Sequence, residues 1–151
     1  MAREFKLSLS SVLTSLNTQV STILGSDWKE LKYIYDPEKN DHRSQNNGFG
    51  VGFSGSATVP GTTKAVTYDS EIFVVLTSQF ANRSSDSSQR EAISTLLDKK
   101  ELLDVSIFQK KLNNSAVLLV SEIGTEAPEI IGEGVVMMRF SYTIKTRNQT
   151  T

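Results

Sequence analysis

The run EIFVVLTSQF, residues 71–80, decides the expected fold. Its centre, residues 72–76, holds five consecutive apolar side chains of aliphatic and aromatic types, without glycine or proline. Such a run is typical of a strand that is buried on both faces. A strand of this kind needs a partner strand at each edge and a covering layer on each face. We therefore expect the rest of the chain to supply its neighbours and its cover.

Length, charge and cysteine content limit the possible functions. The 151 residues fit a single domain, residues 1–151, that can bury a sizeable core. With 16 Lys and Arg against 17 Asp and Glu, the net charge of -1 creates no field that would collect nucleic acid or an anionic membrane. The absence of cysteine excludes disulfides, thiol catalysis and thiolate metal sites.

The N-terminal region, residues 1–16, places a basic residue before apolar positions that serine and threonine interrupt at helical spacing. It lacks the continuous apolar segment of an export signal, so we expect it to belong to the folded domain. No window approaches the roughly 18 consecutive apolar residues of a membrane-spanning helix. We therefore expect no membrane partner.

Two amphipathic helices are expected. Apolar residues recur at three- and four-residue steps across residues 9–24, and Gly25 can close this helix in a left-handed conformation. A second helix should begin at Asp86 or Ser87, which can cap it, and should bury a stripe of leucine and isoleucine. The apolar spacing of residues 105–112 fits either a short strand or one or two helical turns, and both alternatives stay open.

Alternating apolar residues predict further strands at residues 31–35, 49–53 and 136–144, and a second wholly apolar run predicts one at 116–120. Residues 55–68 should form an extended hairpin that reaches away from the body. The fold class that follows is α+β. We expect a mixed, mainly antiparallel β-sheet of about four to five strands, packed with two main helices and with long loops in the first half.

Residues 50–55, GVGFSG, match the G-x-G-x-x-G pattern of phosphate-binding loops. A phosphate site of this kind needs a helix that opens after the last glycine. The next residues, 56–65, contain proline, glycine and β-branched types, which do not begin a helix. The pattern instead predicts a strand with a bare face, against which a large group can pack closely.

The other face of this strand carries Phe49, Val51 and Phe53, which we expect to form an interaction face. A small soluble ligand-binding module that uses this face is the alternative of another functional class.

Four glutamates lie in SEIGTEAPEIIGEG, residues 121–134, without a basic residue among them. Paired carboxylates serve glycoside hydrolysis and metal-assisted chemistry. Neither a calcium-loop pattern nor a histidine ligand accompanies them, so we expect a solvated connection between strands that makes contacts with other molecules. The four residues are Glu122, Glu126, Glu129 and Glu133.

The only histidine, His42, lies in a polar loop without a nucleophile or metal-ligand partner at a meaningful spacing. The chain also lacks a G-x-S-x-G elbow and an H-E-x-x-H helix. We therefore expect no catalytic residue, no bound metal and no cofactor.

The order of elements resembles the tail terminator family of long-tailed bacteriophages. The resemblance lies in the opening helix, residues 9–24, and in the IFVVL strand, residues 72–76, which a serine-rich turn and a helix follow. It also lies in the ending GVVMMRFSYTIKT, residues 134–146. It covers nearly all of the chain and contains no diagnostic motif.

The resemblance implies a non-enzymatic virion protein of the tail and neck, assembled in the host cytoplasm as a ring of typically six subunits on the tail tube. The implied partners are further copies of the chain, the tail tube protein and the head-completion protein, with DNA only as passing cargo. A head-closure or connector subunit is the structural alternative. In such a ring we expect residues 36–66 and the acidic run 122–133 to face neighbours or the channel.

Overall fold

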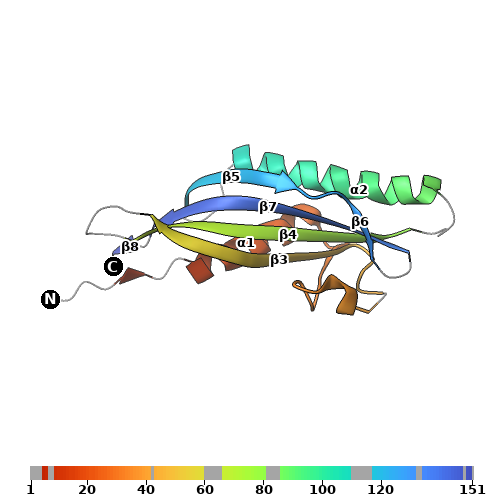
Figure 1. Cartoon of the computed structure of the whole chain (residues 1–151), viewed down its shortest axis with the longest axis horizontal. Coiled ribbons are helices and arrows are strands. Elements are labelled where there is room, and N and C mark those ends of the chain that lie inside the picture. Colours follow the sequence, from red (N-terminus) through yellow and green to blue (C-terminus); the bar gives the residue numbers. More distant parts are fainter. Residues whose placement is uncertain are drawn as a thin grey trace.

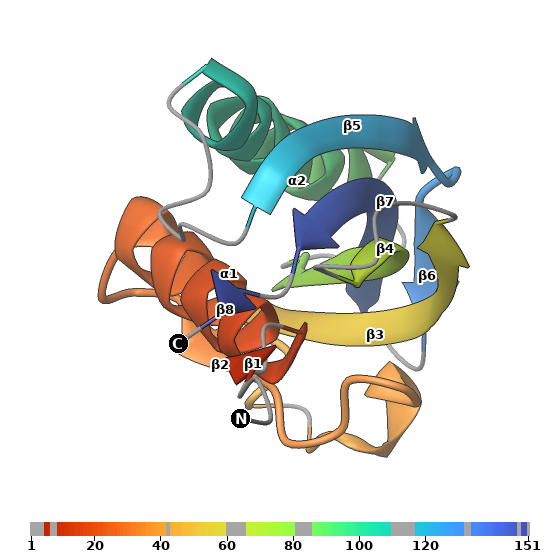
Figure 2. The same ribbon diagram turned by 90° about the vertical axis from the view of Figure 1, so that its left-hand side faces the viewer.

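A computed structural model describes residues 5–6, 9–41, 43–59, 66–80, 86–109, 117–131, 134–147 and 149–150. In these ranges two α-helices lie on one face of a curved, mainly antiparallel β-sheet (Figures 1 and 2), so the α+β fold class is confirmed. The elements in chain order are β1 (Phe5–Lys6), α1 (Leu9–Leu24), β2 (Lys29–Glu30), η1 (Pro37–Lys39), β3 (Gly48–Val59), β4 (Thr67–Gln79), α2 (Asp86–Asp104), η2 (Val105–Gln109), β5 (Val117–Thr125), β6 (Glu129–Ile131), β7 (Val135–Arg147) and β8 (Gln149–Thr150).

Strand β4 is the centre of the sheet. It pairs antiparallel with β3 on one side and with β7 on the other. All five side chains of residues 72–76 are at most 2% exposed, which confirms a strand buried on both faces. Strands β5 and β6 follow one another along the far edge of β7, and β2 pairs in parallel with the start of β3. A separate two-stranded sheet joins β1 to β8.

The face of the sheet that α1 and α2 cover is called the helix face below. Helix α1 has the predicted bounds and buries one stripe of side chains at four-residue steps. Gly25 follows it with a φ of 92°, and its N–H donates to the Ser21 carbonyl at 3.1 Å, so this glycine ends the helix as predicted. Strand β7 supplies its predicted alternating row to the same core: Val136, Met138, Phe140, Tyr142 and Ile144.

The opposite face of the sheet is called the loop face below. Residues 31–41 and 43–47 cover part of it. The Leu31 N–H donates to the Phe49 carbonyl at 2.8 Å, and the described residues of this segment contain no strand and one short 3-10 helix, η1. Leu31 and Ile34 pack there against Phe73, Val75 and Met137 in a second, smaller core. The predicted strand at residues 31–35 is therefore wrong, because Leu31 and Ile34 lie on the sheet as a covering layer while Tyr33 and Tyr35 are exposed.

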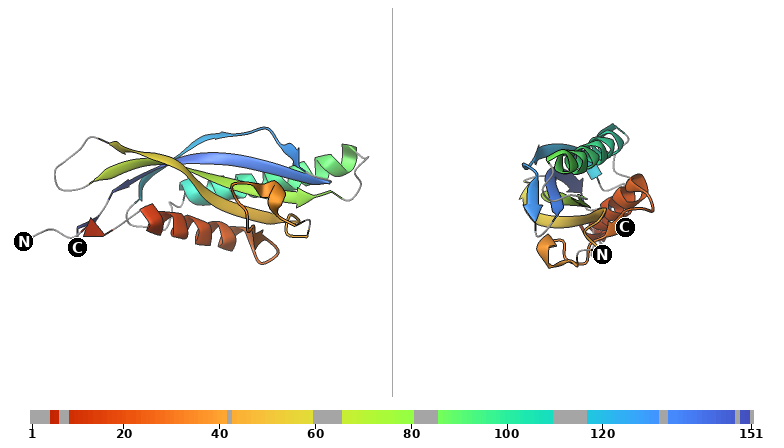
Figure 3. Two further views of the ribbon diagram at one scale, coloured as in Figure 1. Left: turned by 60° about the horizontal axis from the view of Figure 1, so that its bottom comes forward. Right: turned by 90° about the vertical axis from the view of Figure 1, so that its right-hand side faces the viewer.

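The long loops predicted within residues 36–66 are shorter than expected. Strand β3 continues to Val59, and its residues 55–59 pair with residues 67–71 of β4 beyond a bulge between Phe53 and Gly55. These two paired segments, called the arm below, extend past α1 (Figure 3), which confirms the predicted hairpin within the described residues.

Two further segments were open or differ from expectation. Residues 105–109 continue α2 as a wider π-helical turn, which is the helical one of the two alternatives for residues 105–112, and residues 110–112 lie outside the described residues. The predicted solvated connection at residues 121–134 is largely an edge strand, because β5 and β6 both pair with β7 and the Glu126 N–H donates to the Arg139 carbonyl between them at 2.9 Å. The 13 residues of β7 present a long row of backbone groups, and this segment satisfies them.

Candidate functional site

The predicted interaction face of β3 lies mostly in the core. Phe49 is 2% exposed and Val51 is 6% exposed, and both belong to the cluster that α1 and α2 enclose. Only Phe53, at 37% exposed, reaches the surface. Phe49 and Val51 are therefore corrected to core residues, because α1 packs over the strand face that carries them.

Two of the four glutamates are exposed on one edge of the sheet. Glu126 and Glu129 lie at the break between β5 and β6. The backbone of Glu122 belongs to β5, opposite Tyr142 of β7. Glu133 and His42 lie outside the described residues. Across the described ranges, no group of three or more His, Cys, Asp or Glu side chains is arranged to hold a metal ion.

The glycine-rich strand has the predicted bare face. A Cβ atom added to Gly48, Gly50 or Gly52 would collide respectively with Leu31, Ile34 or the ring of Phe73. The missing side chains thus let the loop-face core approach the β3 backbone. The motif lies within a strand rather than before a helix, so it lacks the ring of helix N–H groups that would bind a phosphate.

Polar side chains hold residues 31–47 on the loop face. The Asn40 amide donates to the Tyr33 and Pro37 carbonyls at 2.8 and 2.9 Å, and its oxygen accepts from the Tyr33 N–H at 3.0 Å. Gln45 donates to the same Pro37 carbonyl at 3.0 Å. Both amide side chains are buried and satisfied, so they replace the backbone pairing that this segment lacks.

This loop carries Tyr35 to the outer edge of β3. The Tyr35 ring meets Phe73 edge-on at 5.4 Å between centroids, and the Arg139 guanidinium lies 4.0 Å from the centroid of the same Phe73 ring. The Tyr35 hydroxyl accepts from the Phe53 N–H at 3.0 Å and donates to the Phe53 carbonyl at 3.3 Å. One side chain therefore occupies the backbone groups that an added strand would use at that point.

Both long edges of the sheet have backbone groups that no described strand pairs with. On the β3 edge these groups lie beyond the contact with Tyr35. Among the described strands, only the two-residue β2 pairs with the outer edge of β3, and none pairs with the outer edge of β5 or β6. Because β3, β4, β7 and β5 alternate in direction, the two edges run opposite to one another. Sequence periodicity had no signal for this feature, since it reports burial and not which strand ends a sheet.

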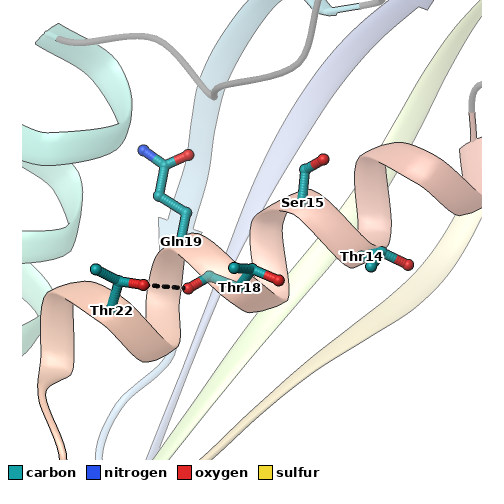
Figure 4. Close-up of a pocket in the computed structure, with 5 residues that line it drawn as sticks. All are labelled: Thr14, Ser15, Thr18, Gln19 and Thr22. Atoms are coloured by element: carbon teal, nitrogen blue, oxygen red, sulfur yellow. Dashed lines mark hydrogen bonds between the residues drawn. The ribbon is translucent and has the colours of Figure 1, made fainter.

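Two surface hollows are present. One lies on helix α1, away from the open edges, and the other lies on the arm. The first, of about 390 Å³, runs along the polar face of α1 and is lined by Thr14, Ser15, Thr18, Gln19 and Thr22 (Figure 4). It contains hydroxyl and amide groups and no charged side chain among these residues, which leaves it without an acid or a base for catalysis. The second, of about 270 Å³, lies on the arm and includes Asp69 and Glu71, and Lys145 approaches Asp69 at 4.0 Å.

One cluster of titratable groups joins α2 to β7. Asp104 accepts a hydrogen bond of 2.7 Å from the hydroxyl of Tyr142 and forms an ion pair with Lys100 one turn earlier. Tyr142 is fully buried, so its hydroxyl needs this partner. The cluster lies where helix packs on sheet, which makes it a structural tie between the two layers.

No protein-family model matches the chain, and no curated protein matches it. In the described part of the chain, no helix combines the length and the apolar character needed to cross a membrane. Among the features described above, the pair of open sheet edges together with the arm is the candidate functional site.

Proposed function

We propose that this chain is a structural virion protein, a tail terminator whose copies form a closed ring that caps the tail tube and joins it to the head-completion protein. The observation that carries the proposal is the pair of open sheet edges with opposite directions. The overall order of elements, which resembles that of tail terminators, supports the choice of this family for the proposal.

The direction of the edges favours a ring of identical subunits. A second copy, rotated about an axis parallel to the strands, brings its β5 edge antiparallel to the β3 edge of the first copy. Each joint then uses two different surfaces and leaves the same two surfaces free at the ends. Such heterologous contacts continue until the rotation closes the ring. A hexamer, as in the resembled family, is the proposed closed form.

A non-enzymatic role fits the chemistry of the described residues. The titratable cluster of Lys100, Asp104 and Tyr142 ties helix to sheet, and the hollow on α1 has uncharged lining residues. The alternative of a ligand-binding module depended on a face of which Phe49 and Val51 are buried. Of the three residues of that face only Phe53 is exposed, which favours the structural role over the ligand-binding module.

The acidic residues suit a place at the joints or along the channel. Glu126 and Glu129 are exposed on one sheet edge, and phosphate is repelled by carboxylates. DNA would thus pass as cargo without being held. Assembly in the host cytoplasm and a final place in the virion neck follow from the same proposal.

Light scattering on the purified protein over a concentration series, alone and with purified tail tubes, tests this function. We expect a discrete ring mass in at least one of the two conditions, and rings at tube ends in electron micrographs. A strict monomer in both conditions without attachment to tube ends would overturn the proposal. Rings that bind head connectors and ignore tube ends would replace the tail terminator with a head-closure protein.

A further inference from the structure

We propose that neighbouring copies join edge to edge, with residues 55–59 of β3 in one copy pairing antiparallel with β5 in the next. This inference rests on the proposed ring and names the surfaces of its joint. The occupant of each open edge is thus a second copy of this chain, and the joint would continue the sheet across the subunit boundary.

At one end of the sheet, both edges carry features that prevent the pairing of a further strand. At the other end, both edges lack such features within the described residues. Along the first half of β3, from Gly48 to Phe53, β2 and the Tyr35 hydroxyl occupy outward-facing backbone groups. Along the opposite edge, Pro128 and two exposed glutamates interrupt the strand between β5 and β6. Proline, charge and short capping strands are the devices that prevent unwanted strand pairing. Within the described residues these devices leave the arm and β5 available.

The open parts lie at the same level of the sheet. Following the pairing across four strands, Gly55 aligns with Glu71, then with Thr143 and then with Ser121 of β5. By the same path Ala57 reaches the level of Leu119. A neighbour can therefore bring the two open segments together by rotation, without a large shift along the strands. A small shift favours closure into a ring over growth into a helical filament.

Each edge carries one exposed apolar side chain, and the two side chains lie at the same position along the strand direction. Phe53 aligns through Ile72 with Tyr142, and the bulge of β5 opposite Tyr142 contains Ile123. Phe53 is 37% exposed and Ile123 is 55% exposed. Pairing of the edges would bring both into one contact and remove apolar surface from water.

Engineered cysteines test the joint directly, because the chain contains no cysteine of its own. Ala57 and Ser121 are exposed and lie on the loop face according to their register. The double variant Ala57→Cys with Ser121→Cys should give a ladder of covalent oligomers with a short bismaleimide, which tolerates a register difference of about 7 Å, or two residues. Each single variant should stay uncrosslinked, and a mixture of the two should stop at dimers.

The matched control pairs Ala57→Cys with Ser94→Cys on the exposed side of α2, and it should give no ladder. Dimers from a single variant would indicate contacts between identical edges and overturn the proposed joint. An intact ring in which the Ala57 and Ser121 double variant gives no ladder would overturn the joint and leave the tail terminator function standing.

A second test places a charge at the apolar contact. Ile123→Asp should raise the concentration at which the ring dissociates by about tenfold or more, because the joint would then bury a carboxylate. Ile130→Asp is the control, since Ile130 is 53% exposed on the same edge but lies level with the guarded start of β3. Circular dichroism should find both variants folded.

Equal dissociation of the two variants, or an unaffected ring in Ile123→Asp, would overturn the proposed joint. The function itself can fail separately: rings that crosslink as expected but never attach to tube ends would keep the joint and remove the tail terminator role. A protein that is monomeric at every concentration and gives no ladder would overturn both.

Discussion

The two faces of the sheet are built by different means. On the helix face, two regular helices cover alternating apolar rows of β4 and β7 in one large core. On the loop face, residues 31–47 cover a smaller core, and their described residues contain no strand. The buried amides of Asn40 and Gln45 hold this segment through hydrogen bonds, and a row of glycines in β3 lets it pack closely on the sheet. The helix-face layer thus follows from periodic apolar patterns in the sequence, whereas the loop-face layer depends on individual side-chain contacts.

The largest effect is expected at the centre of the helix face. Val74 is fully buried there, and Val74→Asp would place an unpaired carboxylate in the main core. The cost is several kcal/mol, about the whole stability of a small domain, so the variant should not fold. Circular dichroism and solubility measure this outcome. A soluble Val74→Asp protein with native ellipticity would show that the helix-face core is less decisive than its burial implies.

A smaller effect is expected at the glycine row of the loop face. Gly50→Ala would drive a Cβ into Ile34, and displacement of the loop should cost about 1–3 kcal/mol in the free energy of unfolding. Thermal or urea unfolding measures the loss. Gly124→Ala is the control, because a Cβ there meets no atom within 4 Å and its φ lies outside the left-handed region. Equal stability of the two variants would contradict the close approach at Gly50.

Removal of the Asn40 amide should destabilise the loop face and leave the helix face unaffected. Asn40→Ala deletes three hydrogen bonds within residues 33–40, and we expect a loss of about 1–3 kcal/mol. Hydrogen exchange should rise in residues 31–47 and stay near its native rate in α1 and β7. Uniformly faster exchange over the whole chain would mean that the loop face and the helix face unfold as one unit.

The smallest effect is a pH dependence of the loop. The Ser44 N–H donates to the exposed Asp41 carboxylate at 2.8 Å, and this bond holds the pKa of Asp41 below its ordinary value. Its contribution is present above the pKa of the unfolded chain and is lost as the pH falls through the lower folded pKa. A carboxyl NMR titration of Asp41 should find the lowered pKa. In Ser44→Pro, which has no N–H to donate, the pKa should return toward its ordinary value, and an unchanged pKa there would exclude this bond as the cause.

The interaction residues illustrate what local patterns omit. Alternation placed Phe49, Val51 and Phe53 on one strand face, which is right, but it had no information on which layer would cover that face. Helix α1 buries the first two, and only Phe53 remains near an edge. Ile123 lies between Ser121 and Glu122 on one side and Gly124 and Thr125 on the other, so a hydropathy pattern carries no sign of its place level with Phe53.

The sequence by itself determined the bounds of α1, the buried centre of β4, the alternating row of β7 and the bare face of β3. These features depend on neighbours within one helix or strand, and the period of apolar residues reports them directly. Only the tertiary structure decided that residues 31–47 pack on the loop face, that the acidic run pairs along β7, and that the open ends of β3 and β5 lie at one level. Those outcomes depend on register and packing between segments far apart in the chain, which no local period encodes.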